Sequence, residues 1–276
     1  MDLSDTLEIY ALTSRGLRRE RNEDYIGHLA YAGVAVLADG MGGYNAGDVA
    51  SSVAVNSILS NLPGSLYNRA QLAELTEFNS TEAAWCYRAA IRANQSVYQV
   101  SQSQPHYTGM GTTLVTALFY NNQVTVAHVG DSRFYRLDGE EGTLTQITRD
   151  HTVLQELIDR GVYTPEEALA SSNKNLVTRA LGVDKKISID ITDTLVNPND
   201  IFLLCSDGLH DLVSEEAIEL TVSTFKDHLD AAATSLIQQA NDAGGHDNTS
   251  VILIKCHKPF PEKTSWFQQF SHWFKR

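Results

Sequence analysis

The sequence is poor in cysteine and has no long apolar run, and each shortage excludes a class of protein. Its three cysteines are scattered and form no CxxC pair. A disulfide framework and a thiolate zinc site are therefore not expected, and the natural compartment is a reducing one. No run of about 18 apolar residues predicts a membrane span, and the acidic start MDLSDTLEIY lacks the apolar region of a signal peptide. We expect a cytoplasmic protein.

Positive charge is also scarce. The chain has 21 lysines and arginines against 34 aspartates and glutamates, a formal net charge of −13. Non-specific binding of nucleic acid needs a basic face and is not expected here. An anionic substrate would need positive charge that side chains do not supply, and bound cations are one source of it.

The pattern of apolar residues predicts a mixed protein without regular βαβ winding. Runs rich in Val, Ile, Thr, Tyr and Leu predict strands at 8–13, 24–37, 112–120, 123–130, 132–137, 187–195, 200–205 and 249–256, with NNQ as a tight hairpin turn. Apolar residues at helical spacing predict helices at 47–61, 80–100, 150–160, 214–223 and 229–242. Hairpins with helices between them favour antiparallel sheets covered by helices. We expect one domain, residues 1–257, and a tail, residues 258–276.

Four predicted strands meet an aspartate among small residues at one end. The stretches are VAVLADGMGG with Asp39, VTVAHVGDSR with Asp131, DIFLLCSDGL with Asp207 and AGGHDNTSVILI with Asp247. A single Asp-Gly pair is explained by a turn. Four such aspartates at the strand ends of one domain would converge if the strands pair, and their charges would repel one another. Oxygen ligands of this kind are typical of Mg²⁺ or Mn²⁺.

The stretch RRERNEDYIG offers further charged groups. Glu23 and Asp24 open a predicted strand, and Arg19 precedes them. In isolation this stretch is explained by a solvated charged turn. Beside a carboxylate–metal cluster, an arginine is well suited to bind a phosphate with two hydrogen bonds.

Seven motifs in order and spacing carry a family resemblance: RRERNED, ADGMGG, MGTTLV, HVGDSRFYRL, RDHT, LLCSDGL and GGHDNTSV. The chain resembles, over residues 8–256, the bacterial branch of the metal-dependent protein phosphatases (PPM) of the protein phosphatase 2C type. The resemblance implies an α+β fold, an α-β-β-α sandwich of two antiparallel sheets flanked by helix pairs. It also implies a metal site at one end and a helical flap near it, at about residues 149–182; a plain surface helix pair is the alternative for that segment.

The resemblance also implies ligands for two metal ions, Mn²⁺ or Mg²⁺. Asp39 would bridge the two ions, and the carbonyl of Gly40 would bind one of them. Asp207 and Asp247 would complete the first site, while Glu23 would hold waters of the second.

A third, weaker metal site and a phosphate contact follow in the same way. Asp131 and Asp207, with Asp211 as a tentative member, would form the third site. Arg19 matches the phosphate-binding arginine of the family, and Asn248 matches a common supporting residue.

The resemblance implies a protein serine/threonine phosphatase that opposes a bacterial serine/threonine kinase. Water activated by the two ions would attack the phosphorus of phosphoserine or phosphothreonine in line. Met41 stands where animal members carry a histidine proposed as the acid, so a metal-associated water is the candidate acid, with His151 and His246 as weaker ones. A phosphoprotein-binding module without turnover and a phosphatase of small phosphomonoesters stay as alternatives.

Two cysteine-containing stretches could suggest a different, cysteine-dependent chemistry. Cys86 and Arg92 have the spacing of cysteine-dependent phosphatases, but CYRAAIR lacks the glycine-rich loop which that chemistry needs and reads as a helix interior. Cys205 is predicted to be a small buried residue of the core.

The tail has an aromatic face at helical spacing: Trp266, Phe267, Phe270, Trp273 and Phe274. Docking on the protein's own surface, on a partner and on a membrane surface are the alternatives for it. We expect a monomer.

Overall fold

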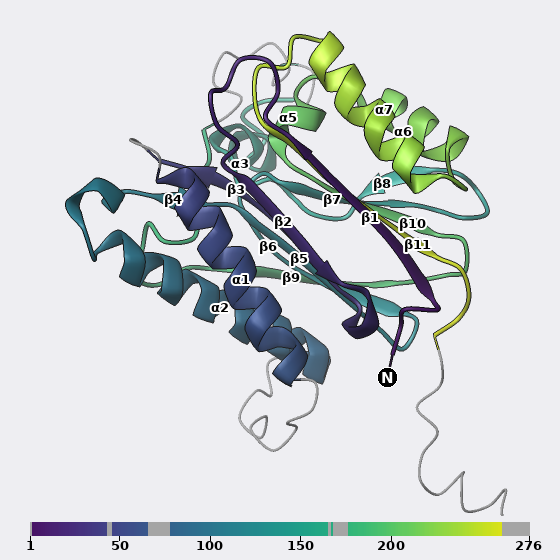
Figure 1. The fold of residues 1–276 in the computed structure, drawn as a ribbon, viewed down its shortest axis with the longest axis horizontal. Coiled ribbons are helices and arrows are strands. Elements are labelled where there is room, and N and C mark those ends of the chain that lie inside the picture. The colour runs from purple at the N-terminus through teal and green to yellow at the C-terminus, as the bar shows by residue number, and fades with distance from the viewer. Residues whose placement is uncertain (1, 43–45, 66–77, 165–166, 168–175, 261–276) are drawn as a thin grey trace, which may run out of the picture.

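Two antiparallel sheets form the centre of the computed structural model, which describes residues 2–42, 46–65, 78–164, 167 and 176–260 (Figure 1). The first sheet has the strand order β1 (Leu7–Ser14), β11 (Thr249–Cys256), β10 (Ile201–Cys205), β7 (Arg133–Leu137), β8 (Leu144–Gln146). The second has the order β2 (Asp24–Leu29), β3 (Val34–Met41), β5 (Leu114–Tyr120), β6 (Gln123–Val129), β9 (Asp190–Leu195), and the short β4 (Gly111–Thr112) pairs with β3.

Helix pairs cover both outer faces of this sandwich. Helices α1 (Gly47–Ser65) and α2 (Thr81–Ser101) lie on the second sheet, and α6 (Glu215–Thr224) and α7 (Leu229–Asp242) lie on the first (Figure 1). Shorter helices are α3 (Val153–Asp159), α5 (Asp207–His210), η1 (Ala30–Ala32) and η3 (Pro105–Tyr107). The predicted α-β-β-α sandwich is confirmed.

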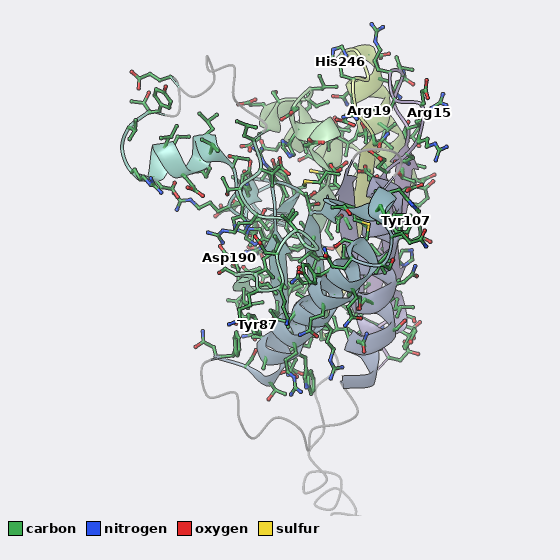
Figure 2. All side chains as sticks on the ribbon, turned by 90° about the vertical axis from the view of Figure 1, so that its left-hand side faces the viewer. Arg15, Arg19, Tyr87, Tyr107, Asp190 and His246 are labelled. Carbon is green, nitrogen blue, oxygen red and sulfur yellow. The ribbon has the colours of Figure 1, made fainter. Side chains whose placement is uncertain are left out.

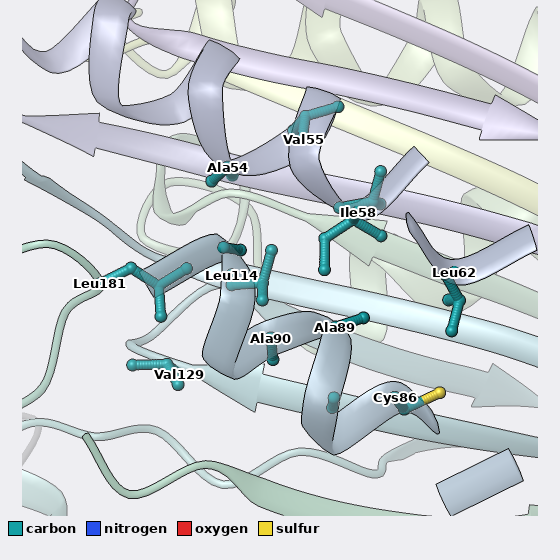
Figure 3. Close-up of a cluster of buried hydrophobic side chains, with 14 of the residues drawn as sticks. Ala54, Val55, Ile58, Leu62, Cys86, Ala89, Ala90, Leu114, Val129 and Leu181 are labelled. Carbon is teal, nitrogen blue, oxygen red and sulfur yellow. The ribbon is translucent and has the colours of Figure 1, made fainter. Parts of the chain in front are cut away.

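Three buried apolar layers hold the four structural layers together. Between the sheets, Phe202 meets Phe119 edge-on, with ring centroids 5.2 Å apart, and stacks on Phe134 at 5.6 Å. Under α1 and α2, small residues such as Ala89 and Ala90 let the helices approach the sheet closely (Figure 3). Burial of these apolar surfaces is the main stabilising term of the fold.

Local sequence signals explain several element boundaries. Asn121 and Asn122 both have positive φ, 46° and 57°, which is the backbone of the two-residue turn that joins β5 to β6. The hydroxyl of Ser80 accepts the amide hydrogen bond that caps α2, and Ser214 caps α6 in the same way. In the flap, the Thr164 hydroxyl accepts from the Glu167 amide while the Glu167 carboxylate accepts from the Thr164 amide. This reciprocal pair is a capping box.

The predicted strand 24–37 is wrong, because the chain turns back on itself inside it. Strand β2 ends at Leu29, and a turn of 3₁₀ helix leads to Gly33, whose φ is +66°. A Cβ at Gly33 would lie 2.6 Å from the carbonyl oxygen of Phe119, so the sharp turn needs glycine. Both strands are rich in the same residue types, so the pattern shows one run. Strands β4 and β8 and helix α5 are too short to leave a periodic signal, and the sequence did not predict them.

Antiparallel pairing brings the chemically interesting loops to one end of the sandwich. Ser14 at the end of β1 pairs with Thr249 at the start of β11, and Cys205 at the end of β10 pairs with Arg133 at the start of β7. In the second sheet, Asp24 at the start of β2 pairs with Asp39 near the end of β3. The loops 15–23, 130–132 and 244–248 therefore meet at this end.

Phe260, three residues beyond the expected end of the domain at residue 257, packs into the core. Phe260 is 3% exposed and belongs to the layer between the sheets, and its amide donates to the side-chain oxygen of Asn122 at 2.6 Å. The aromatic residues of the predicted tail lie outside the described residues. Within the described part of the chain, no helix is long and apolar enough to cross a membrane.

Replacing Phe260 by alanine should lower the free energy of unfolding by about 3 kcal/mol, because it leaves a cavity beside Phe119. Chemical denaturation measures this change. Leu220→Ala, at a position 69% exposed on α6, is the control and should change stability by less than about 0.5 kcal/mol. Equal effects of the two substitutions would show that Phe260 is not part of the core.

Candidate metal centre

Burial and neighbouring carboxylates raise the pKa of two of the predicted aspartates, Asp39 and Asp207, at the end of the sandwich. Burial, and then the charges of Asp24, Asp207, Asp131 and Asp247, hold the pKa of Asp39 well above its usual range. Burial and the charges of Asp131 and Asp247 do the same for Asp207. Five aspartates therefore interact in one place, although most of them are far apart in sequence. Without a cation, protonation relieves the repulsion in such a cluster.

Two oxygens in this cluster, Oδ1 of Asp24 and Oδ1 of Asp207, have no hydrogen-bond partner among the described residues. Oδ1 of Asp207 is buried, and the described residues supply no hydrogen bond to it. A buried polar atom without a partner is rare in folded proteins. The oxygen-rich donor set and the unsatisfied Asp207 oxygen fit a hard divalent cation such as Mn²⁺ or Mg²⁺.

Asp24 plays a different part from the other carboxylates. Its Oδ2 accepts hydrogen bonds from the hydroxyls of Ser206, at 2.8 Å, and Ser250, at 2.6 Å. The side chain is 6% exposed, and burial raises its pKa to about 6. Asp24 therefore ties the start of β2 to β10 and β11, between the two sheets.

Glu23 and Gly40 are held against each other by their backbones. The Gly40 amide donates to the Glu23 carbonyl at 3.1 Å, and the Ser51 hydroxyl donates to the same carbonyl at 2.6 Å. A Cβ at Gly40 would lie 2.0 Å from the Gly47 carbonyl oxygen. The glycine is thus required by close packing against the start of α1. The sequence alone does not predict this packing requirement at Gly40.

Asn248 joins the loop 15–23 to the segment that carries Asp247. Its Nδ2 donates to the carbonyls of Arg15, at 3.0 Å, and Arg21, at 2.8 Å. Its Oδ1 accepts from the Glu23 amide at 2.8 Å. One buried amide side chain therefore positions the whole loop, which agrees with its predicted supporting place.

Thr113 connects two of the predicted metal ligands, and sequence reasoning assigned it no role. Its Oγ1 accepts from the Asp39 amide at 2.9 Å and shares a hydrogen bond of 2.7 Å with the Ser132 hydroxyl. The Thr113 amide donates to the Asp39 carbonyl at 2.8 Å. Asp39 and the residue after Asp131 are thereby fixed relative to each other. A threonine in a strand is ordinary, so only the motif MGTTLV could have pointed to it.

The turn that presents Asp131 is held by two histidines. Gly130 has φ of +103° and donates its amide to Nδ1 of His151 at 3.1 Å, while the His151 amide donates to the Gly130 carbonyl at 2.9 Å. His210, which sequence reasoning did not single out, has Nε2 3.1 Å from the Asp131 carbonyl and Nδ1 3.5 Å from the carboxylate of Asp211.

This geometry disfavours His151 as a general acid. Nδ1 accepts a hydrogen bond, so the neutral ring carries its proton on Nε2, which faces Asp190 at 3.2 Å. Burial and the neighbouring His128 lower the pKa of His151 to about 4. The ring is therefore neutral near pH 7, and its contacts suit a role in holding the Gly130 turn.

The group His128, His151 and Asp190 offers possible ligand atoms within 4.8 Å of one another. Most of its atoms contact other partners, while Nδ1 of His128 is buried and has no hydrogen-bond partner among the described residues. Nε2 of His151 carries a hydrogen, Nε2 of His128 lies 2.9 Å from the Arg149 carbonyl, and Arg179 donates to Asp190 at 2.9 Å. The Arg179 guanidinium, which also lies 3.3 Å from Nε2 of His151, places positive charge in this group, so a structural cluster fits it better than a metal site.

Arg19 lies at the edge of the centre. Its Nη2 donates to Oδ2 of Asp247 at 2.6 Å, and the side chains are 50% and 33% exposed. That hydrogen bond raises the pKa of Arg19. His246 lies at the same end of the molecule, as Figure 2 shows. The structure thus brings Arg19 next to the carboxylates, as the sequence predicts.

The cysteine pattern has no place in this centre. Cys86 is fully buried on α2 (Figure 3), while Arg92 is exposed on the same helix. Burial raises the pKa of the Cys86 and Cys205 thiols, which keeps both from acting as thiolates.

Comparisons with known proteins identify the family. The family model described as Protein phosphatase 2C matches residues 13–243. Protein phosphatase PhpP of Streptococcus pneumoniae is 36% identical over 255 residues, which cover 91% of this chain and 98% of that one. Serine/threonine phosphatase stp of Listeria welshimeri is 37% identical over 248 residues, covering 88% and 93%. The chain belongs to the protein phosphatase 2C family.

Similarity to solved structures agrees with this family assignment. The serine/threonine phosphatase PstP/Ppp of Mycobacterium tuberculosis superposes with a TM-score of 0.80 at 35% identity, covering 91% of this chain and 99% of that one. The catalytic domain of PstP in complex with two manganese ions gives a TM-score of 0.78 at 35% identity, with 92% and 99% covered. The family resemblance, the fold and the dependence on metal predicted from the sequence are confirmed.

Asp24→Asn should remove part of the pH dependence of the metal-free protein. The pKa of Asp24 is about 6 in the folded protein and about 3.9 in an unfolded chain. Between these values the folded state binds the extra proton, so the free energy of unfolding falls as pH rises from 4 to 6. We expect wild type to lose on the order of 1–3 kcal/mol more than the variant over this range.

Denaturation in EDTA at several pH values between 4 and 7 measures this difference. Asparagine keeps an oxygen that accepts from Ser206 and Ser250, so the hydrogen bonds of the site are preserved. Identical pH profiles for the two proteins would contradict the assignment of the raised pKa to Asp24.

Proposed function

We propose that Asp39, Asp207 and Asp247, with Glu23 and the carbonyl of Gly40, hold the two divalent ions of this phosphatase. The protein is a metal-dependent protein serine/threonine phosphatase that hydrolyses phosphoserine and phosphothreonine. The observation that carries the ligand assignment is the convergence of mutually repelling carboxylates around the unpartnered Oδ1 of Asp207. The two manganese ions in the structure of the PstP catalytic domain support the number of ions.

A third, weaker site fits beside the first two. Asp131 and Asp207 would share it with Asp211, whose amide donates to the Asp207 carbonyl at 2.9 Å. His210 touches both the Asp131 backbone and the Asp211 carboxylate. The short helix α5 therefore begins with one proposed ligand, Asp207, and is followed directly by another, Asp211.

The ions, when bound, lower the pKa of water and neutralise charge on the transferring phosphoryl group. The residues of the chain position the substrate around them. Arg19 donates one hydrogen bond to Asp247, and its remaining donors, which bind no other described residue, can reach phosphoryl oxygens. Thr113 and Asn248 keep Asp39 and the Arg19 loop in fixed relative positions. Such positioning is a large part of catalysis of phosphoryl transfer.

The proton for the leaving serine or threonine oxygen needs a source other than Met41, which has none. His151 is buried and neutral. His246 is exposed next to Asp247 and stays a candidate, together with water in the site.

The phosphatase reading is favoured over the alternatives. A binding module without turnover is expected to lack metal ligands, whereas Asp39, Asp131, Asp207 and Asp247 are all present. Activity on free phosphoserine relative to a phosphopeptide separates a small-molecule phosphatase from a protein phosphatase. We further propose that the protein acts as a monomer and opposes a serine/threonine kinase. For residues 258–276, docking on the protein's own surface, on a partner and on a membrane surface stay as alternatives. The phosphoprotein substrates implied by its relatives support the kinase relationship.

Asp207→Asn should abolish Mn²⁺-dependent hydrolysis of a phosphothreonine peptide, with a loss of at least about 100-fold in kcat, since a ligand charge is removed at constant shape. Activity is measured on metal-stripped protein with and without Mn²⁺. Asp5→Asn, at an exposed position near the N-terminus, makes the same charge change and should leave activity intact.

The shift of the unfolding temperature on adding Mn²⁺ provides a second readout. Wild type should be stabilised more than Asp207→Asn, because metal bound to the folded state stabilises it. Full activity or an undiminished Mn²⁺ shift in Asp207→Asn would exclude this aspartate as a ligand.

A further inference from the structure

The loop between β1 and β2 concentrates positive charge at the proposed active site. Its residues 15–21 contain four arginines, Arg15, Arg18, Arg19 and Arg21, and one acidic residue, Glu20. We call residues 15–21 the arginine loop. Four positive and one negative charge give it a net charge of +3, in a chain whose net charge is −13. All four arginines are exposed.

The arginine loop is rigidly attached to the segment that carries Asp247. The amides of Leu17 and Arg18 both donate to the Gly245 carbonyl, at 2.8 and 3.1 Å. Asn248 binds the loop at both ends, through the carbonyls of Arg15 and Arg21. Gly16 has φ of +72°, and a Cβ there would lie 2.2 Å from the Asp247 carbonyl oxygen. The loop therefore lies directly on the backbone of a proposed metal ligand.

The guanidinium groups of three of these arginines form no ion pair with a described residue. Arg19 pairs with Asp247, but none of the carboxylates in the described ranges forms an ion pair with Arg15, Arg18 or Arg21. Arg15 only donates to the Glu20 carbonyl at 3.2 Å. By contrast, Arg133 and Arg136 in strand β7 bind Asp150 and Asp200. In a protein with an excess of carboxylates, positive charge without such partners is available to a ligand.

Figures 1 and 2 agree with the placement of the arginine loop beside the proposed active site. Arg15 and Arg19 lie close to His246 at the same end in Figure 2, and β1, β2 and α7 reach that end in Figure 1. A peptide whose phosphorylated residue reaches Arg19 and the carboxylate cluster would pass the arginine loop.

We propose that the arginine loop binds negative groups beside the phosphorylated residue, so that the preferred substrates are phosphoproteins with clustered negative charge. This inference rests on the proposed function of the site. Guanidinium groups bind carboxylates and phosphates with paired hydrogen bonds, so both acidic side chains and a second phosphate fit. The loop also provides a local positive field that offsets repulsion between an acidic substrate and an acidic protein.

The test compares three phosphothreonine peptides on the Mn²⁺-loaded full chain. One has neutral neighbours, one has aspartates beside the phosphothreonine, and one carries a non-hydrolysable phosphonate analogue of phosphoserine nearby. The variant replaces Arg15, Arg18 and Arg21 by glutamine. The control replaces Arg92, Lys226 and Lys258 by glutamine, an equal charge change at exposed positions on α2, before α7 and after β11.

Wild type should show a kcat/KM about five to ten times higher for the charged peptides than for the neutral one, since exposed ion pairs are individually weak but three act together. The ratio of kcat/KM for the charged peptides to kcat/KM for the neutral one should fall to near one in the arginine-loop variant and stay unchanged in the control. It should also shrink in about 0.5 M salt, because screening weakens exposed charge pairs. Comparison of the two charged peptides shows whether carboxylates or phosphates are preferred.

Equal kcat/KM values for charged and neutral peptides in wild type would overturn the proposal, as would an equal loss of preference in the control variant. Failure to hydrolyse any peptide would instead count against the proposed function. Peptide affinities measured by fluorescence anisotropy decide the role of the loop in that case: a preference for charged peptides that the loop variant loses supports it, and no preference overturns it.

Discussion

Repulsion between carboxylates is the constraint on which the rest of this structure depends. Asp39, Asp131, Asp207 and Asp247 share one end of the sandwich, and burial together with their mutual charge raises the pKa of Asp39 and Asp207. In the metal-free protein, binding of protons relieves this repulsion. Divalent cations remove the conflict and supply the positive charge that a phosphate substrate needs. Bound cations thus allow a protein with an excess of acidic residues to act on an anionic substrate.

The fold meets this constraint through backbone contacts more than through the ligands themselves. Thr113 links the Asp39 backbone to Ser132, and Asn248 links Glu23 to the loop that carries Arg19. Gly40 permits the close contact of β3 with the start of α1. Because each of these groups is held by two or more partners, the charged side chains keep their places despite their repulsion.

Charge is divided between two parts of the proposed active site. The strand ends supply the negative charge that holds metal, while the arginine loop supplies positive charge for the substrate. The two parts meet at the Arg19–Asp247 ion pair, at 2.6 Å. This arrangement lets one site hold cations and anions side by side, since the loop and the cluster are fixed by the same residue, Asn248.

The sequence by itself determined the strands that end in aspartate, the helix pairs, the family and the kind of metal, because these depend on local periodicity, on residue type and on short motifs. It misplaced the turn at Gly33, where two similar strands show one continuous pattern. Only the tertiary structure decided that His151 is committed to Gly130, that Gly40 is required by packing against Gly47, and that Thr113 and His210 join the centre. These features depend on contacts between segments far apart in the chain, and hydrogen-bond partners of this kind leave no periodic signal in a single sequence.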